Sequence, residues 1–401
     1  MSVETTAGPA NAAGAADNEV LAAVAAAEAV LTRRFGASIR LADPEDLRGS
    51  GKSTVLRVRV ASTPFSLPRT LVVKSYLEPP VGDLVDPFPH EAVSYQLFTA
   101  LGQDDRICPE LIAHDGAKRV IVLEDLGRAP TLADKLLDHD ARGAERALLA
   151  WARALGRLHA TTAGREADFD ALTRRLGGSP GQDPLARKAK VALAELPDLL
   201  HDVLGVTVGA DALGHAREGG RLLTSSRHRA FSPSDACADN NLITGKGLRV
   251  LDFEGGCVRD VALDAAALRI PFPLCGCSFR LPNGMTEAMV AAWRAEVSPV
   301  FPDLDDDEVL MPKLLHGQLL WVWLSTWMYL PRPGVPDGPI TTRLASPRRS
   351  SALHARWQRL RDDAARLKVP AVAEHAEQVA SAIAAQHGAE AVHLPLFPAF
   401  S

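Results

Sequence analysis

The first third of the chain alternates apolar and polar positions in short runs that end at glycine or proline. Five of these runs are rich in β-branched residues and leucine and predict strands: SIRLADP, STVLRVRVAS, RTLVVKSY, ELIAHDG and KRVIVLEDLG. A helical pattern, HEAVSYQLFTALG, separates the third run from the fourth. We therefore expect a small sheet with one helix inserted after its third strand.

After residue 127 the apolar positions follow the 3.6-residue period of helices. This period predicts long helices at about 131–163, 181–204, 307–330, 350–367 and 370–388. One segment, which we call the exceptional segment, differs from this pattern. Its sequence, RAFSPSDACADNNLITGKGLRVLDFEGG, has the pattern of two short strands around an irregular loop. The chain is therefore expected to be α+β, with an amino-terminal lobe at residues 18–126 and a larger, mostly helical lobe at 127–401.

The first residues lack a periodic apolar face. Residues 1–17 are small, polar or interrupted by Gly and Pro, so burial cannot offset the entropy lost on ordering them. We expect a disordered tail there. A helix is predicted to begin with Asn18 as its N-cap and to end before Gly36.

The composition is that of a globular protein, since 47% of the 401 residues are apolar and 23% are charged. These values exclude collagen-like and wholly disordered proteins. The net charge of −5 leaves no excess of Lys and Arg for a polyanion, so no nucleic-acid partner is expected. The chain has no basic amino-terminal region and no apolar run of about 18 residues, the length that spans a membrane. These features favour a cytoplasmic protein without a membrane partner.

Five cysteines form no CxxC pair, and their odd number favours reduced thiols over a disulfide framework: Cys108, Cys237, Cys257, Cys275 and Cys277. A zinc site built from the last four is conceivable. Their spacings of 20, 18 and 2 residues match no zinc finger or ribbon. Buried thiols are therefore the favoured interpretation.

Three polar residues in the exceptional segment suggest a chemistry. Asp235 lies in the loop, Asn240 enters a strand five residues later, and Asp252 follows the next strand. Phosphoryl transfer from ATP needs one carboxylate to accept the proton of the attacking hydroxyl. It also needs an amide and a second carboxylate to hold Mg²⁺ on the phosphates. The three residues match this requirement.

The amino-terminal lobe supplies complementary groups in the required order. Lys74 lies in the third predicted strand, where its positive charge could reach the α- and β-phosphates. Glu91 opens the next helix, where its carboxylate could form an ion pair with Lys74. Between the first two strands lies a flexible turn whose amides suit phosphate, made of Gly49, Ser50 and Gly51. Either charge alone is more often a surface residue, but the combination favours a function.

With these residues the chain resembles the aminoglycoside phosphotransferase and choline kinase-like group of the protein-kinase-like superfamily. The resemblance covers residues from about 38 to 270 and rests on these positions: Lys74, Glu91, Leu123–Leu126, Leu158–Ala160, Asp235–Asn240, Asp252–Glu254 and Arg259–Asp264. It implies a bilobal fold with an antiparallel sheet in the smaller lobe. It also implies ATP and Mg²⁺ as cofactors.

The resemblance assigns a role to each matching residue. Asp235 would be the catalytic base, and Asn240 and Asp252 the magnesium ligands. Lys74 would hold the phosphates, with Glu91 as its partner. The backbone of the hinge would hydrogen-bond adenine, through Glu124, Asp125 and Leu126.

The chain departs from the family pattern at two points near the loop. Pro233 and Ser234 stand where the family has His and Gly, so the histidine that braces the loop is missing, and Arg259 replaces a glycine. His159 is expected to lie in the core or behind the site.

The expected activity is transfer of the γ-phosphoryl group of ATP to a hydroxyl of a small molecule such as an amino sugar, amino alcohol or natural product. Two alternatives remain open. The long carboxy-terminal region also suits a Ser/Thr kinase that acts on a peptide, and the altered loop suits a nucleotide-binding protein without catalysis. Nothing in the sequence indicates an oligomeric state.

Overall fold

The computed structural model describes residues 9–49, 53–79, 85–103, 105–224, 226–235, 237–332, 334–341 and 345–401, with the backbone alone for 9–16. The chain divides into two compact units. Unit 1 contains the described residues up to Arg128 together with Arg175–Gly178, and unit 2 contains Ala129–Arg174 and Ser179–Ser401.

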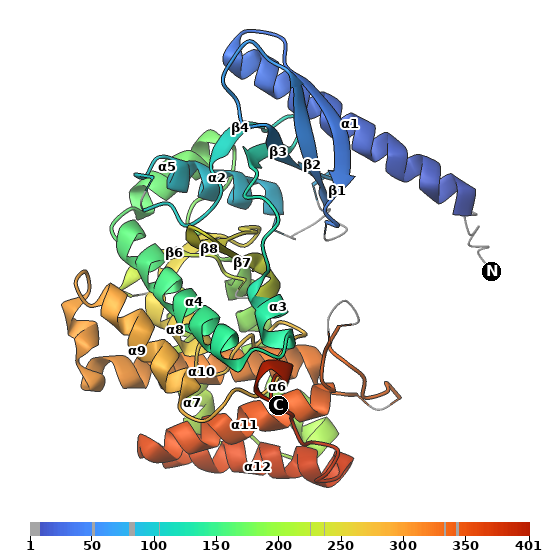
Figure 1. Cartoon of the computed structure of the whole chain (residues 1–401). Coiled ribbons are helices and arrows are strands. Elements are labelled where there is room, and N and C mark those ends of the chain that lie inside the picture. The colour runs from blue at the N-terminus through green and yellow to red at the C-terminus, as the bar shows by residue number, and fades with distance from the viewer. Residues whose placement is uncertain are drawn as a thin grey trace. The chain divides into compact units, whose positions relative to one another are not determined.

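Unit 1 is built on a five-stranded antiparallel sheet in the order β1-β2-β3-β5-β4 (Figure 1). Its strands lie close to the five predicted runs: β1 (Arg40–Asp46), β2 (Ser53–Ser62), β3 (Thr70–Tyr76), β4 (Leu111–Asp115) and β5 (Val120–Glu124). Helix α2 (Pro87–Thr99) follows β3, as predicted. The prediction of an α+β chain with a small sheet in this region is therefore confirmed.

Helix α1 (Pro9–Phe35) covers one face of this sheet. Its buried residues Ala27 and Leu31 share a hydrophobic core with Val58 on β2 and Val73 on β3. The helix begins at Pro9, so the prediction that Asn18 caps its start is wrong. Alanine occupies most positions from 10 to 16 and has the highest helix propensity, and proline suits a first helical position. Residues 1–8 of the predicted tail lie outside the described residues.

Unit 2 is mostly helical, as predicted. Its helices are α3 (Leu132–Leu137), α4 (Ala141–Thr162), α5 (Glu166–Arg175), α6 (Pro184–Leu204), α7 (Ala210–Arg221), α8 (Val261–Ala267), α9 (Met285–Val297), α10 (Asp307–Tyr329), α11 (Arg349–Arg366) and α12 (Pro370–His387). The predicted helix at about 131–163 is divided into α3 and α4. Helices α5, α7, α8 and α9 were not predicted.

The exceptional segment of unit 2 forms four short strands where two were expected. Strand β6 (Arg229–Ser232) pairs with β9 (Cys257–Asp260), and β7 (Asn241–Thr244) pairs with β8 (Gly247–Val250). A short 3₁₀ helix, η1 (Ala238–Asn240), precedes β7. Two more lie later in the chain, η2 (Pro302–Asp305) and η3 (Pro398–Phe400).

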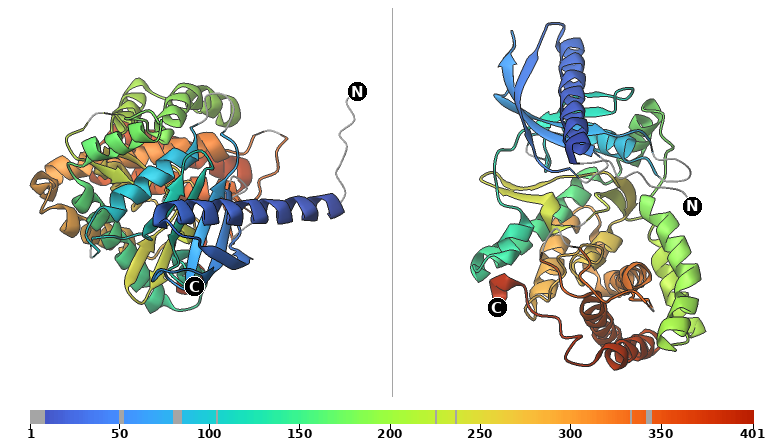
Figure 2. Two further views of the ribbon diagram at one scale, coloured as in Figure 1. Left: turned by 90° about the horizontal axis from the view of Figure 1, so that it is seen from above. Right: turned by 90° about the vertical axis from the view of Figure 1, so that its right-hand side faces the viewer.

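Helix α10 forms the centre of the core of unit 2 and packs against α6, α7, α8 and α11. Trp321 and Trp323 on α10 are buried, and each indole N–H donates to a backbone carbonyl, that of Leu263 at 2.7 Å and that of Ala192 at 2.9 Å. Both tryptophans therefore belong to the core of this unit. Helices α11 and α12 lie side by side (Figure 2). Among the described helices, none combines the length and apolarity that crossing a membrane requires.

The approach of α7 to α10 gives a prediction about stability. A Cβ atom at Gly219 would lie 2.4 Å from the carbonyl oxygen of His316, whereas one at Gly214, on the same helix, would meet open space. We expect Gly219→Ala to lower the free energy of unfolding by about 1–3 kcal/mol through overpacking. Gly214→Ala should raise it by about 0.5–1 kcal/mol through helix propensity. Urea titration of both variants tests the contact, and equal effects would contradict it.

His375 on α12 lies among aromatic rings in the core. Its ring centroid lies 6.0 Å from that of Trp323 and 5.5 Å from that of Trp357. Within the described residues, neither ring nitrogen has a hydrogen-bond partner. Burial lowers the pKa of His375 from 6.5 to about 4, because the charged form would lose its hydration without a compensating contact.

This depressed pKa predicts a loss of stability in acid. Between pH 6.5 and about 4 the unfolded chain binds a proton at His375 that the folded chain does not. Lowering the pH through this range should therefore cost up to about 3 kcal/mol of unfolding free energy. His375→Leu should remove this part of the pH dependence in urea titrations at about pH 7.5 and about pH 4.5. The control His139→Leu, at an exposed position, should leave it unchanged.

Candidate functional site

Lys74 and Glu91 form a buried ion pair in unit 1, as the sequence predicts. Their Nζ and Oε2 atoms lie 2.7 Å apart, and the side chains are 9% and 1% exposed. Successive residues of β3 point to opposite faces, so Val73 packs into the core beneath α1 while Lys74 points to the other face. A buried ammonium group needs a charged partner, and Glu91 on α2 provides it.

The start of α2 is fixed by contacts that the sequence analysis missed. The Asp86 side chain accepts a hydrogen bond from Phe88 N, and Arg119 donates to both Asp86 carboxylate oxygens at 2.7 and 2.8 Å. Arg119 also lies over the Phe88 ring. Burial alone would raise the pKa of Asp86, but the Arg119 and Phe88 hydrogen bonds lower it. These contacts position α2, and with it Glu91, against the turn between β4 and β5. The Asp-Pro pair before the helical run was the available sequence signal.

In the predicted hinge, Glu124 to Leu126, hydrogen bonds hold the Asp125 side chain, and the backbone N–H of Glu124 is already paired. Asp125 accepts hydrogen bonds from Arg57 Nε at 2.9 Å and Nη2 at 3.1 Å. Burial alone would raise the pKa of Asp125, but the hydrogen bonds from Arg57, Thr70 and Gly127 lower it. The Glu124 N–H donates to the Glu110 carbonyl at 2.9 Å. A contact between this segment and adenine would therefore use backbone groups other than the Glu124 amide.

The turn between β1 and β2 is described only in part. Ser50 and Gly51, two of the predicted phosphate-binding residues, lie outside the described residues. At Gly49 a Cβ atom would lie 2.0 Å from the carbonyl oxygen of Ser53, so only glycine fits this close approach of the two strands.

In unit 2, the predicted base and one predicted magnesium ligand lie in contact. The Asn240 amide nitrogen donates to Asp235 Oδ2 at 3.3 Å, and the Cys237 N–H donates to Asp235 Oδ1 at 3.0 Å. Leu251 N donates to the Asn240 carbonyl at 2.8 Å, which ties this loop to the segment that carries Asp252. The structure therefore brings together the three polar residues that the sequence singled out.

The surroundings of Asp235 raise its pKa above the usual value of a carboxyl group. The side chain is open to solvent, yet the protein around it removes part of its hydration, and this desolvation raises its pKa to about 6. The Cys237 N–H opposes the shift, and the carboxylates of Asp252 and Asp239 add to it by like-charge repulsion. A pKa near the working pH is typical of a general base.

A further carboxylate accompanies Asp252. Carboxylate oxygens of Asp252 and Glu254 lie within 4.8 Å of each other. Together with Asn240 they offer only hard oxygen donors, which is the donor set that Mg²⁺ prefers. The chemistry of these residues therefore fits a magnesium ion. The sequence analysis quoted Glu254 within a motif without assigning it a role.

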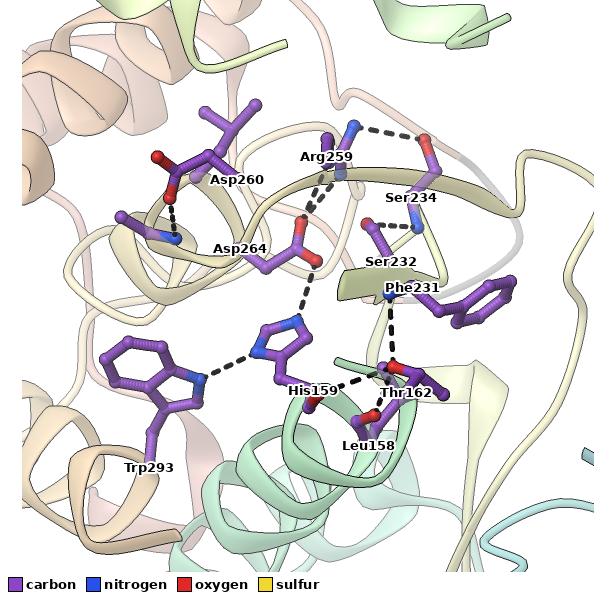
Figure 3. Close-up of polar contacts among 12 residues, drawn as sticks. Leu158, His159, Thr162, Phe231, Ser232, Ser234, Arg259, Asp260, Asp264 and Trp293 are labelled. Atoms are coloured by element: carbon purple, nitrogen blue, oxygen red, sulfur yellow. Dashed lines mark hydrogen bonds and ion pairs between the residues drawn. The ribbon is translucent and has the colours of Figure 1, made fainter. Parts of the chain in front are cut away.

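A buried hydrogen-bond network lies behind the loop (Figure 3). The Trp293 indole N–H donates to His159 Nδ1 at 2.9 Å, and His159 Nε2 lies 3.1 Å from Asp264 Oδ2. Because Nδ1 accepts a hydrogen bond from Trp293, Nε2 carries the imidazole hydrogen and donates a hydrogen bond to Asp264. His159 is fully buried, as expected, and it orients Asp264.

Arg259 joins this network to the loop. Its Nη2 donates to Asp264 Oδ1 at 2.7 Å, and its Nη1 lies 3.5 Å from both Asp183 Oδ2 and Ser234 Oγ. Burial raises the pKa of Asp264, but the charge of Arg259 and the His159 hydrogen bond outweigh it, so the net pKa is well below the usual range. The guanidinium therefore contacts Ser234, the residue next to Asp235. The unusual arginine at this position was the sequence signal for this role.

Comparisons with known proteins give structural likenesses alone. No protein-family model and no curated protein matches the chain. A choline/ethanolamine kinase family protein from Mesorhizobium loti is 16% identical with a TM-score of 0.44, and the match covers 85% of this chain and 93% of that one. A putative fructosamine-3-kinase from Haemophilus somnus is 12% identical with a TM-score of 0.45, over 86% and 99% of the two chains.

A third solved structure is an aminoglycoside-3'-phosphotransferase of type VIII, which is 20% identical with a TM-score of 0.37. The match covers 71% of this chain and 93% of that one.

The buried network predicts a strong effect on stability. Arg259 is 1% exposed, so Arg259→Met leaves the Asp264 charge buried with its main partner removed. We expect this variant to lose about 3–5 kcal/mol of unfolding free energy. Arg229 on the neighbouring strand β6 pairs with Glu166 at the start of α5 and is partly exposed, so Arg229→Met should cost below about 1 kcal/mol. Chemical denaturation of both proteins measures the difference, and comparable losses would contradict the assignment.

Proposed function

We propose that this protein transfers the γ-phosphoryl group of ATP to a hydroxyl of a small molecule. The observation that carries the proposal is the Lys74–Glu91 ion pair, at 2.7 Å and almost without exposure. Phosphoryl transfer in kinases uses a strand lysine held by a helix glutamate in this order. The pair is costly to bury, and holding a cation ready for phosphate explains its place on the face of β3 away from the α1 core.

The residues of unit 1 are assigned to the nucleotide. Lys74 would contact the α- and β-phosphates, and Glu91 would keep its ammonium group oriented. The turn that contains Gly49 would place backbone N–H groups against phosphate oxygens. Backbone groups of Asp125 and Leu126 would hydrogen-bond adenine, because Arg57 and Glu110 already hold this segment in place.

The residues of unit 2 are assigned to the acceptor and the metal. Asp235 would orient the acceptor hydroxyl and take up its proton, which its raised pKa supports. Asn240 and Asp252 would hold Mg²⁺, with Glu254 beside them. When bound, Mg²⁺ neutralises negative charge on the transferred group. Asn240 also donates to Asp235 and thereby fixes the orientation of the base.

The acceptor is proposed to be a small molecule. The solved structures that resemble this chain carry names of kinases for choline or ethanolamine, for fructosamine and for aminoglycosides. Amino alcohols, amino sugars and sugar-derived amines are therefore the first acceptors to test.

The test is transfer of labelled phosphate from [γ-³²P]ATP to a panel of such acceptors. Asp235→Asn should lower the rate by about 10²–10⁴-fold, because it removes the general base without changing the shape of the side chain. It should retain Mg-ATP binding in calorimetry. Asp252→Asn should lose both transfer and magnesium-dependent ATP binding. The control Asp198→Asn, at an exposed position on α6, should leave both unchanged.

Each remaining outcome decides between functions. An unchanged rate in Asp235→Asn or Asp252→Asn would overturn the assignment of these residues. Phosphate found in Ser or Thr peptides, and in no small acceptor, would identify a peptide kinase. Tight Mg-ATP binding without transfer to any acceptor would identify a non-catalytic nucleotide-binding protein.

A further inference from the structure

Three cysteines and one aspartate gather beside Asp235, and we refer to Cys237, Asp239, Cys275 and Cys277 as the thiol cluster. The Sγ atoms of Cys237 and Cys275 and a carboxylate oxygen of Asp239 all lie within 4.8 Å of one another. Cys277 Sγ lies 3.0 Å from Cys275 Sγ. The cluster lies entirely within unit 2.

The cysteines of the cluster are free thiols, with Cys275 and Cys277 buried as expected and Cys237 half-buried. The spacing in sequence matches no zinc finger because the ligands come from two segments nearly forty residues apart, joined only in the folded chain. Cys257 has different neighbours, because burial raises its pKa well above the usual value and the charges that act on it are those of Asp183, Arg259 and Asp264. It serves as a natural control.

The segment that carries Cys275 and Cys277 is held in one conformation. Cys275 N donates to the Phe272 carbonyl at 3.1 Å, and the Phe272 ring stacks on Trp151 with centroids 5.1 Å apart. A Cβ atom at Gly276 would lie 2.0 Å from Thr341 Cγ2, so glycine lets the turn approach its neighbour. Two thiols are therefore presented together on a preorganised turn, as a metal site requires.

A buried positive charge near the cluster favours the anionic, thiolate form of its cysteines. Arg356 is 4% exposed, and within the described residues its Nε and Nη1 have no hydrogen-bond partner. Burial lowers the pKa of Arg356 to about 10, and the neighbouring Tyr329 and Cys275 partly offset this. A buried guanidinium is stable only when negative charge faces it.

We propose that Cys237, Cys275 and Cys277, together with Asp239, bind one Zn²⁺ ion. Three thiolates and one carboxylate form a four-ligand set of the kind that zinc takes in structural sites. The thiol protons pass to solvent as the three Zn–S bonds form. With Zn–S bonds of about 2.3 Å, the sulfur atoms of a tetrahedral site lie about 3.8 Å apart, so Cys277 moves slightly away from Cys275. Asp239 is exposed and leaves an entry path for the ion.

The charge of the filled site fits its surroundings. The four ligands carry four negative charges and Zn²⁺ two positive ones, so the occupied cluster keeps a net negative charge. This charge compensates Arg356. The three thiols are soft ligands that select Zn²⁺ over Mg²⁺, so the two cations would occupy separate positions.

Zinc at this position would also order the loop that carries Asp235 and Asn240, because Cys237 and Asp239 alternate with them along the chain. This consequence rests on the proposed function, whereas zinc binding itself does not. Metal content and phosphate transfer are therefore measured separately.

The experiment uses the full chain, purified without an affinity tag and in a reducing buffer. We expect one zinc per chain by elemental mass spectrometry, released by a thiol-blocking reagent and captured by a chromogenic chelator. Protein stripped of metal should bind Co²⁺ with a thiolate-to-cobalt charge-transfer absorption in the near ultraviolet. Cys275→Ser should lose both signals, and the control Cys257→Ser should retain them.

The outcomes separate the proposal from its rivals. Wild-type protein that takes up neither zinc nor Co²⁺ under reducing conditions overturns the proposal, even if Cys275→Ser fails to fold. A disulfide between Cys275 and Cys237 or Cys277, found by mass spectrometry in metal-free protein that cannot be loaded after reduction, overturns it in favour of a redox pair. Bound zinc without phosphate transfer to any acceptor supports the metal site and contradicts the proposed function alone.

Discussion

The requirement that a buried charge have a charged partner governs how this chain builds its functional residues. Lys74 and Glu91 satisfy the requirement in unit 1, and Arg259 and Asp264 satisfy it in unit 2. Removing one partner of such a pair costs far more than the pair contributes to stability. Each pair therefore holds its elements in one arrangement, α2 against β3 in the first unit and the start of α8 beneath the loop in the second.

The same constraint explains how the loop is supported without the histidine of the family pattern that the sequence resembles. The guanidinium of Arg259 contacts the Ser234 hydroxyl, and it also donates hydrogen bonds to Asp264 and Asp183. His159 holds the second oxygen of Asp264, and Trp293 fixes the tautomer of His159. A network of five side chains thus supports the loop, and Ser234, the residue before Asp235, contacts this network through Arg259.

Local patterns in the sequence predicted the elements and the order of the charged residues. Alternating β-branched residues identify all five strands of unit 1, and Lys74 and Glu91 are neighbours across one strand-to-helix connection. Contacts between distant segments carry no such signal: Arg119 meets Asp86 from 33 residues away, and Cys275 meets Cys237 through the tertiary fold. The start of α1 was missed for another reason, because the helix propensity of successive alanines outweighs the absence of an apolar face.

The density of carboxylates around the loop explains why cations are expected there. Burial raises the pKa of Asp235, and the nearby carboxylates of Asp252 and Asp239 raise it further. Arg259 cannot neutralise them, because Asp264 and Asp183 already occupy its guanidinium. The loop therefore holds more negative charge than its own side chains can compensate. Oxygen ligands at Asn240 and Asp252 suit a hard cation, and the sulfur atoms of the thiol cluster suit a soft one. Because the two sets differ in ligand chemistry, two cations can bind near one segment without competition.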